Sequence, residues 1–264
     1  MTQTRTMLIT GASAGIGAAL AREYASRGWN LVLVARREDR LRALAAELRA
    51  AHGTTCTVIS ADLFSETAVP DLMSALGGLE IDGLINNAGY GHPGTFLSSE
   101  WEAHRNFNHL MTVVPIELTR ALLPGMVGRG YGRVIQVASL AGHMPGSKGH
   151  TLYAAVKAYL IKFAESLNAE MKGTGVHVSA LCPGFVLTEF HDVNGTRAGI
   201  DALPGFMVME APTCARLAAD ALERNTAVFI SGRVNRGLAR LNRWMPWLGR
   251  RIMNSGASSY RNTD

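Results

Sequence analysis

The sequence has few cysteines, few charged residues and no long hydrophobic run. Its three cysteines, Cys56, Cys182 and Cys214, form no CxxC pair, so the sequence indicates neither a disulfide framework nor a zinc site. No apolar run approaches the roughly 18 to 20 residues that a membrane span needs, and the apolar start at Met7 to Ile9 is too short for a signal peptide. We therefore expect a soluble, cytoplasmic protein without a metal site.

Acidic residues are nearly absent from the end of the chain. From Arg224 onward there are eight arginines against Asp264 alone, which is +7 within a total net charge of +5, so the preceding part carries −2. A basic tail can attract an acidic partner or a membrane surface. The body lacks the basic stripe of a nucleic-acid-binding protein, so we expect no nucleic-acid partner.

Short runs rich in β-formers alternate with segments of helical period along the 264 residues, of which 47% are hydrophobic. Parallel strands need crossover connections and are buried on both faces, which matches this alternation. The pattern predicts a single doubly wound α/β domain with a parallel sheet of about seven strands. The expected strands are Thr6 to Thr10, Asn30 to Ala35, Thr55 to Ser60, Asp82 to Asn86, Arg133 to Ala138, Val176 to Leu181 and Ala227 to Ser231.

A glycine-rich turn, TGASAGIG from Thr10 to Gly17, lies between the first expected strand and an alanine-rich helix. Gly11 allows a tight turn, Gly15 a close approach of a pyrophosphate, and Gly17 the packing of helix on strand. The helix N-terminus then offers N–H groups to an anion. The alternative is a strand, turn and helix without a ligand.

Two arginines follow the second expected strand, where an acid would bind the ribose hydroxyls of NAD(H). Arg36 and Arg37 favour the 2′-phosphate of NADP(H), unless both are ordinary surface residues. Asp62, after the third strand, either bonds the adenine or caps the strand end. Asn86 to Gly89 closes the fourth strand and is expected to line the cofactor.

Tyr153 and Lys157 stand four residues apart in a helical pattern, so their side chains share one face. An ammonium beside a phenol favours the phenolate and lowers the tyrosine pKa toward the range of acid-base catalysis. Ser139, fourteen residues before Tyr153, follows the fifth strand and can bond the same substrate oxygen.

With these motifs in this order, residues 5 to 190 resemble the short-chain dehydrogenase/reductase family. The resemblance implies a Rossmann fold, with Tyr153 as general acid/base, Ser139 orienting the substrate oxygen and Lys157 holding the nicotinamide ribose. It also implies a nicotinamide carboxamide contact for Thr188, after Pro183-Gly184. The predicted cofactor-binding residues are Gly11, Ser13, Ala14, Gly15, Ile16, Gly17, Arg36, Arg37, Asp62, Leu63, Asn87, Ala88, Gly89, Tyr153, Lys157, Pro183, Gly184, Val186 and Thr188.

The sequence departs from the family at one position. The family usually has an asparagine in the helix after the fourth strand, where it anchors a proton-relay water, and the alignment places Met111 there. A thioether has no hydrogen-bond donor and is only a weak acceptor. Either Asn108 replaces the asparagine or the relay is altered or absent. Two hypotheses follow: an NADP(H)-dependent oxidoreductase, or an NADP(H) sensor with weak or no catalysis.

Two segments frame the expected substrate site. Residues 184 to 211 are expected to be irregular and to form a lid with several apolar side chains, which favours an apolar ketone or secondary alcohol. Residues 232 to 264 form a basic extension with the pattern of two short amphipathic helices broken at Pro246. This extension either docks on the domain or a second subunit, or contacts a membrane surface. The family commonly forms dimers or tetramers, so we expect a homodimer or homotetramer.

Overall fold

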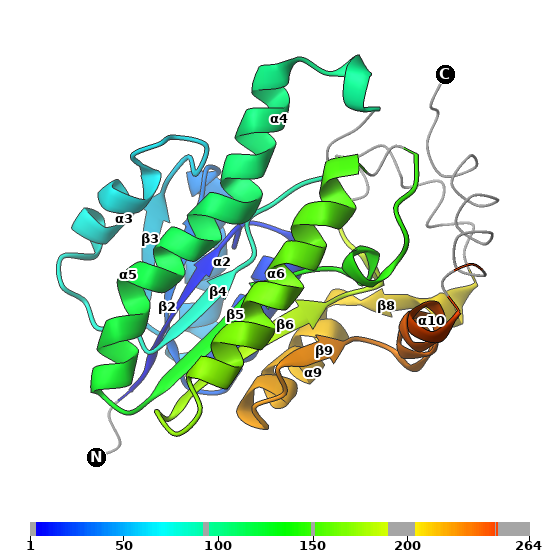
Figure 1. Ribbon diagram of the computed structural model, residues 1–264. Helices are drawn as coiled ribbons and strands as arrows, with labels where there is room; N and C mark the ends of the chain where they lie inside the picture. Colours follow the sequence, from blue (N-terminus) through cyan, green and yellow to red (C-terminus); the bar gives the residue numbers. More distant parts are fainter. Residues whose placement is uncertain (1–3, 92–94, 149–150, 190–203, 246, 248–264) are drawn as a thin grey trace.

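Seven parallel strands form one sheet in the computed structural model, which describes residues 4–91, 95–148, 151–189, 204–245 and 247 (Figure 1). Their order is β3-β2-β1-β4-β5-β6-β9. β2 and β3 are thus added on one side of β1, and the strands from β4 onward are added on its other side. The predicted α/β class and all seven predicted strands are confirmed, with five of them differing by one residue at one or both ends. The strands are β1 Thr6–Thr10, β2 Asn30–Ala35, β3 Cys56–Ser60, β4 Gly83–Asn86, β5 Gly132–Val137, β6 Val176–Cys182 and β9 Val228–Ile230.

Helices cover both faces of this sheet. On one face α1 (Gly15–Ser26), α2 (Glu38–His52) and α9 (Ala211–Glu223) pack around a core that includes Leu20 and Leu33. On the other face α3 (Ala68–Leu76), α5 (Val114–Gly128) and α6 (Thr151–Glu170) bury a second core, seen in front of the sheet in Figure 1. Burial on both faces explains why the central strands read as continuous apolar runs.

One helix is irregular at the point where it passes the sheet edge. α4 (Trp101–Asn108) continues through a π-helical turn, η2 (His109–Val113), into α5. The combined helix Trp101–Gly128 is long and apolar enough to cross a membrane, which the sequence analysis did not expect. Its α5 part packs Leu118 and Met126 into the core of the sheet, as a core helix does.

The segment expected to be an irregular lid contains regular structure. β7 (Phe185–Leu187) and β8 (Val208–Glu210) form a separate two-stranded parallel sheet, and the short helix η4 (Gly205–Met207) leads into β8. The prediction of an irregular segment is therefore wrong at both ends of 184–211. Runs of three residues are too short to show a strand period. Residues 190–203 of the predicted lid lie outside the described residues.

The tail begins with one of the two predicted amphipathic helices, α10 (Arg233–Trp244), which ends before Pro246. Asn235 and Ala239 are buried against the domain. The Asn235 side chain donates to the Ser231 carbonyl at 2.7 Å, and the Asn242 side chain donates to the His143 carbonyl at 2.6 Å. α10 is therefore docked on the domain, while the second predicted helix lies outside the described residues.

Candidate active site

Each of the three glycines in the turn between β1 and α1 has a structural reason to be glycine. Gly11 and Gly15 have φ of +65° and +57°, in the left-handed region that favours glycine. A Cβ added at Gly17 would lie 2.3 Å from the Gly11 carbonyl oxygen, so any other residue would push the turn away from the helix. α1 has no acidic residue in its first turn, and Ala14 at its N-cap has no side-chain acceptor. The turn thus fits the pyrophosphate of a dinucleotide at the helix N-terminus; the predicted Ser13 and Ile16 lie in it, half-buried.

Thr10 and Asn87 hold this turn against the end of β4. The Thr10 hydroxyl accepts hydrogen bonds from the backbone N–H groups of Asn87 and Ala88, at 3.0 Å each, and donates to the Ile85 carbonyl. The Asn87 side-chain amide donates to the carbonyls of Thr10 and Gly11 at 2.9 and 3.1 Å. Sequence reasoning missed Thr10 as a site residue, although a hydroxyl that closes β1 was the available signal. Direct contact of Asn87, Ala88 or Gly89 with a cofactor stays a prediction.

Arginines gather where β2 meets α2. Arg37 donates to the Ser13 hydroxyl from Nε at 3.3 Å and from Nη2 at 3.2 Å, which joins it to the glycine turn. The Arg36 guanidinium lies 5.4 Å from the ring centre of Phe64. Sequence reasoning missed Arg40, whose guanidinium is in an ion pair with Glu189 at 2.7 Å. The three side chains are exposed, so an anion can reach them.

Asp62 and Leu63 follow β3 at the same edge of the sheet. Asp62 is exposed, and its carboxylate accepts a hydrogen bond from the Phe64 backbone N–H at 3.2 Å. Leu63 is buried in the core. The capping role that the sequence left open for Asp62 is thus present, and its contact with an adenine stays a prediction.

The loop that carries Ser139 packs tightly on α6. Ser139 precedes the short helix η3 (Leu140–His143), and its hydroxyl oxygen accepts from the Ala141 backbone N–H at 3.1 Å. A Cβ at Gly142 would lie 2.7 Å from the Ala158 nitrogen and from the Lys157 carbonyl carbon. This close approach fixes the loop of Ser139 beside the turn of α6 that carries Lys157.

Tyr153 and Lys157 lie on the same face of α6, as predicted, with the Lys157 Nζ 5.7 Å from the centre of the Tyr153 ring. Lys157 is buried and donates to the Val137 carbonyl at 2.7 Å. Burial lowers its pKa from 10.5 to about 8, and the nearby Cys182 thiol opposes this change. Lys157 thus remains mostly charged at pH 7, which is the state that lowers the pKa of a neighbouring phenol.

Met111 lies in η2 and faces this site. It is 1% exposed and packs with Phe107 and Val156, next to the half-buried Tyr153. A Cβ at Gly89 would lie 2.7 Å from the Met111 sulfur, so Met111 also borders the end of β4. Asn108, which the sequence left open as a replacement for the missing asparagine, is exposed at the end of α4. The helix is irregular here, but this placement does not support a catalytic role for Asn108.

The segment after β6 returns over the glycine turn. The Pro183 carbonyl accepts from the Leu140 backbone N–H at 2.8 Å, which ties this segment to the loop of Ser139. Gly184 has no room for a Cβ because the Asn235 amide would lie 2.2 Å away. Val186 is buried in β7, and Thr188 lies against Gly15, where an added Cβ would be 3.4 Å from the Thr188 Cβ.

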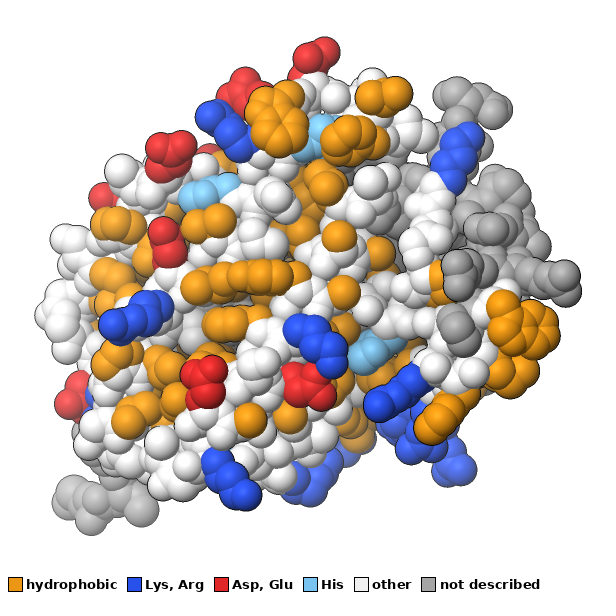
Figure 2. Space-filling view, in the orientation of Figure 1, with side chains coloured by type: hydrophobic (Ala, Val, Ile, Leu, Met, Phe, Trp, Pro, Cys, Tyr) orange, Lys and Arg blue, Asp and Glu red, His pale blue; other side chains and the backbone are white. Residues whose placement is uncertain are grey.

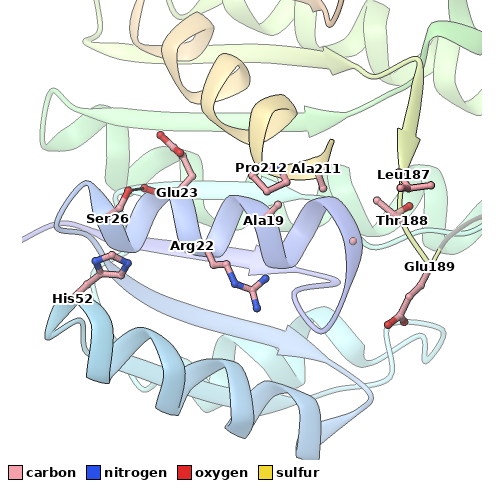
Figure 3. A pocket seen from close by; sticks show the side chains of 11 residues that line it. Ala19, Arg22, Glu23, Ser26, His52, Leu187, Thr188, Glu189, Ala211 and Pro212 are labelled. Atoms are coloured by element: carbon pink, nitrogen blue, oxygen red, sulfur yellow. Dashed lines mark hydrogen bonds between the residues drawn. The ribbon is translucent and has the colours of Figure 1, made fainter. Parts of the chain in front are cut away.

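A groove of about 500 Å³ runs along the outer side of α1 (Figure 3). Arg22 and Ser26 of α1 line it, together with Pro212 at the start of α9. At one end it reaches Gly15 and Thr188, beside the glycine turn. Ser139, Tyr153 and Lys157 do not line it, so it is separate from the predicted catalytic residues.

Comparison with known proteins identifies the family. The family model described as short chain dehydrogenase matches residues 5–198. This chain is a short-chain dehydrogenase. It is 37% identical over 187 residues to the oxidoreductase UcpA of Salmonella typhimurium, which covers 70% of each protein.

Two solved structures are similar over nearly the whole chain. A short-chain dehydrogenase from Sphingobium yanoikuyae in complex with NADPH has a TM-score of 0.80, with 33% identity and 98% coverage of both chains. A bulky-bulky ketone specific alcohol dehydrogenase from Comamonas testosteroni has a TM-score of 0.78, with 32% identity and 94% coverage of both chains. This short-chain dehydrogenase is thus an oxidoreductase of a family that acts on alcohol and ketone groups with a nicotinamide cofactor.

Proposed function

We propose that this short-chain dehydrogenase is an NADP(H)-dependent oxidoreductase that interconverts an apolar ketone and its secondary alcohol. The observation that carries the proposal is the buried Lys157 on the same face of α6 as Tyr153, with the loop of Ser139 packed against that helix. A protein that only binds the cofactor has no need for this arrangement.

Each of the three predicted catalytic residues has its own role in the proposed reaction. The nicotinamide supplies or accepts the hydride. In the direction of reduction, the Tyr153 hydroxyl donates its proton to the carbonyl oxygen of the substrate, and the Ser139 hydroxyl donates a hydrogen bond to the same oxygen. The Lys157 ammonium would favour the phenolate of Tyr153 and would hold the ribose of a bound cofactor. In the reverse direction Tyr153 accepts the proton.

The preference for NADP(H) is supported by Arg36 and Arg37 after β2, where the chain has no acid to bind ribose hydroxyls. The Sphingobium yanoikuyae structure was solved with NADPH, which agrees with this preference. We expect Arg36→Asp to weaken NADPH binding about tenfold or more, because one ionic contact to the phosphate is replaced by a repulsion. Arg49→Asp, at the other end of α2, is the control; equal NADPH and NADH affinity in the wild type would contradict the preference.

The apolar substrate class is supported by the side chains at the lid. In the two-stranded sheet of β7 and β8, Phe185 lies opposite Val208 and Val186 lies opposite Met209, so this part of the lid is apolar. The Comamonas testosteroni relative is described as specific for ketones with two bulky substituents. A panel of apolar ketones, keto-steroids and 3-ketoacyl thioesters, with a small polar ketose as the contrasting substrate, identifies the class by NADPH consumption.

Tyr153→Phe tests the reaction itself. The variant keeps the ring and loses only the proton-carrying hydroxyl, so we expect turnover to fall by roughly a thousandfold or more while NADPH affinity changes little. The Tyr159→Phe variant, on an exposed part of the same helix, is the matched control. Retained turnover in Tyr153→Phe, or loss of NADPH binding, would contradict the proposed role.

Met111 favours a second candidate function, an NADP(H) sensor with weak or no catalysis. The side chain is at the aligned position of the family's asparagine, and the exposed placement of Asn108 does not support it as a replacement. NADPH binding without turnover of any substrate in the panel would support the sensor. Turnover that disappears in Tyr153→Phe would exclude it.

We also propose that the protein is a cytoplasmic homodimer or homotetramer. Large apolar side chains are exposed on the outer helices, among them Val113 at the end of η2 and Tyr159 on α6. Light scattering after size-exclusion chromatography measures the number of subunits, and a monomer at micromolar concentration would contradict the proposal.

A further inference from the structure

The outward face of α10 combines positive charge with exposed tryptophan. Arg233, Arg240 and Trp244 lie at spacings of seven and four residues, so they share the face opposite to the buried Asn235 and Ala239. Trp244 is 80% exposed, and Trp247, just beyond the helix, is 56% exposed. Figure 2 shows blue and orange side chains together over α10.

The positive charge of this face is not neutralised. Within the described residues, Arg233 and Arg240 on this face and the exposed Arg243 at its edge form no ion pair with a carboxylate. The sequence from Arg224 to Thr263 contains no aspartate or glutamate, and it has further arginines at 250, 251 and 261. The face is thus complementary in charge to an anionic surface.

The start of α4 also has an exposed tryptophan, but it lacks the positive charge of α10. At the start of α4, Trp101 is 71% exposed and Leu97 is 92% exposed. The neighbouring charges there are Glu100 and Glu102, and Arg105 is paired with Glu102. That site has apolar area but no net positive charge, so among these two sites only α10 suits an anionic partner.

Charge and tryptophan on one helix favour a lipid surface over a nucleic acid or an acidic protein. Arginines are attracted to anionic headgroups, while tryptophan is stable at the depth where headgroups meet acyl chains. A nucleic acid would need a wider basic surface, whereas the chain before Arg224 carries a net charge of −2. We propose that the outward face of α10 binds the surface of an anionic lipid bilayer.

The opposite face of α10 contacts both loops that frame the predicted catalytic site. Asn242 holds the His143 carbonyl at the end of η3, and Asn235 lies against Gly184. A bilayer bound at the outward face of α10 would thus be separated from these loops by this one helix, which would bring a lipid-dissolved apolar substrate near the predicted catalytic site. This last step rests on the proposed function, but binding of α10 to lipid does not.

Co-sedimentation of the full-length protein with vesicles tests the proposal. We expect binding to phosphatidylcholine vesicles that contain phosphatidylglycerol, and little binding to phosphatidylcholine alone. Arg240→Glu/Arg243→Glu should weaken binding by about tenfold or more, since each basic residue near the surface contributes to the attraction. Arg49→Glu/Arg224→Glu makes the same change of charge on exposed residues elsewhere and should leave binding within about twofold.

The tryptophans give a second, independent comparison. Trp244→Ala should weaken vesicle binding several-fold and Trp101→Ala should not, although both side chains are highly exposed. Trp244 fluorescence should shift to shorter wavelength with anionic vesicles, which is read as the difference between the wild type and Trp244→Ala. Both variants change exposed side chains, and circular dichroism verifies that they are folded.

Five results would overturn the proposal, four in the binding assays and one in the subunit number. The first four are absence of binding to anionic vesicles, equal binding to both kinds of vesicle, an equal loss in the two double-arginine variants, and binding to duplex DNA without binding to vesicles. A change in the number of subunits in Arg240→Glu/Arg243→Glu would also overturn it, because the face would then be an interface between copies of the chain. Turnover is also measured without vesicles. The α10 variants should keep the turnover of the wild type there, so a failure of lipid binding can be told apart from a failure of the proposed function.

Discussion

Glu189 and Arg40 form an ion pair that joins the segment after β7 to the N-terminal part of α2. Both carboxylate oxygens of Glu189 accept from Arg40 Nη1, at 2.9 and 2.7 Å, and Arg37 Nη1 lies 3.5 Å from the same carboxylate. Arg37 also donates to Ser13 in the glycine turn. The carboxylate thus pairs with two guanidinium groups, and one of them, Arg37, is proposed to bind the 2′-phosphate of the cofactor.

Glu189→Gln should therefore strengthen the binding of NADPH. The ion pair is about half-exposed, and such pairs contribute roughly 0 to 1 kcal/mol. Releasing the arginines should lower the Kd for NADPH by about two- to fivefold, with no change for NADH. Fluorescence titration measures both constants. Glu47→Gln, which breaks the similarly exposed pair of Glu47 with Arg22, is the control; an equal change for NADH and NADPH would contradict this role of Glu189.

Gly142→Ala should impair catalysis through the position of Ser139. The new Cβ would lie 2.7 Å from backbone atoms of Lys157 and Ala158, which cannot move without shifting α6. We expect kcat to fall about tenfold or more, and NADPH affinity to stay nearly unchanged, because a shift on the order of 1 Å in a positioning group can have such an effect.

Gly146→Ala is the control for this prediction. Gly146 lies in the same loop, and an added Cβ has no neighbour within 4 Å. The kcat of Gly146→Ala should equal that of the wild type. An equal loss of kcat in the two variants would contradict this prediction, because it would mean that replacing any glycine of the loop impairs catalysis, with or without a clash against α6.

Most of the fold could be predicted because it follows from patterns among residues that are close together in the sequence. The run Leu31 to Ala35 is apolar throughout and buried on both faces, so its strand is evident in the sequence. The glycine turn has a fixed spacing, and Tyr153 and Lys157 share a face by helical period alone. Each of these features is determined by residues that lie within a few positions of one another in the sequence.

What the sequence did not reveal depends on contacts between distant residues. Glu189 and Arg40 are 149 residues apart, and neither lies in a motif. β7 and β8 pair across the segment between Leu187 and Val208, and each has only three residues. The π-helical turn that buries Met111 and exposes Asn108 has no signal in an apolar period of 3.6 residues.

Met111→Asn should destabilise the protein although it restores the family's usual residue. Met111 is 1% exposed among Phe107, Val156 and other apolar side chains, so an amide there loses its hydrogen bonds with water and also leaves a smaller side chain. We expect the free energy of unfolding to fall by about 2 to 4 kcal/mol. Met111→Leu, which conserves volume, should change it by less than about 1.5 kcal/mol. Urea unfolding measures both; an unchanged or raised stability of Met111→Asn would show that a polar partner, such as a buried water, is present.

Lys157 should make the stability of the protein without cofactor depend on alkaline pH. Its pKa falls from 10.5 in the unfolded chain to about 8 in the folded protein, mainly because burial disfavours the charged form. Between these values the unfolded state binds more protons, so the contribution of Lys157 to the free energy of unfolding rises with pH. Below pH 8 both states are protonated and the full unfavourable effect of the buried charge is present.

Lys157→Met isolates this effect because it removes the ionisable group and keeps much of the chain length. The free energy of unfolding of the variant minus that of the wild type should fall by on the order of 2 to 3 kcal/mol as pH rises from 7 to 10. Urea unfolding at the two pH values gives the difference, and subtracting the two proteins removes the titration of other tyrosines, cysteines and lysines. A pH-independent difference would mean that Lys157 keeps its ordinary pKa when folded, and that the ammonium beside Tyr153 is better hydrated than its burial indicates.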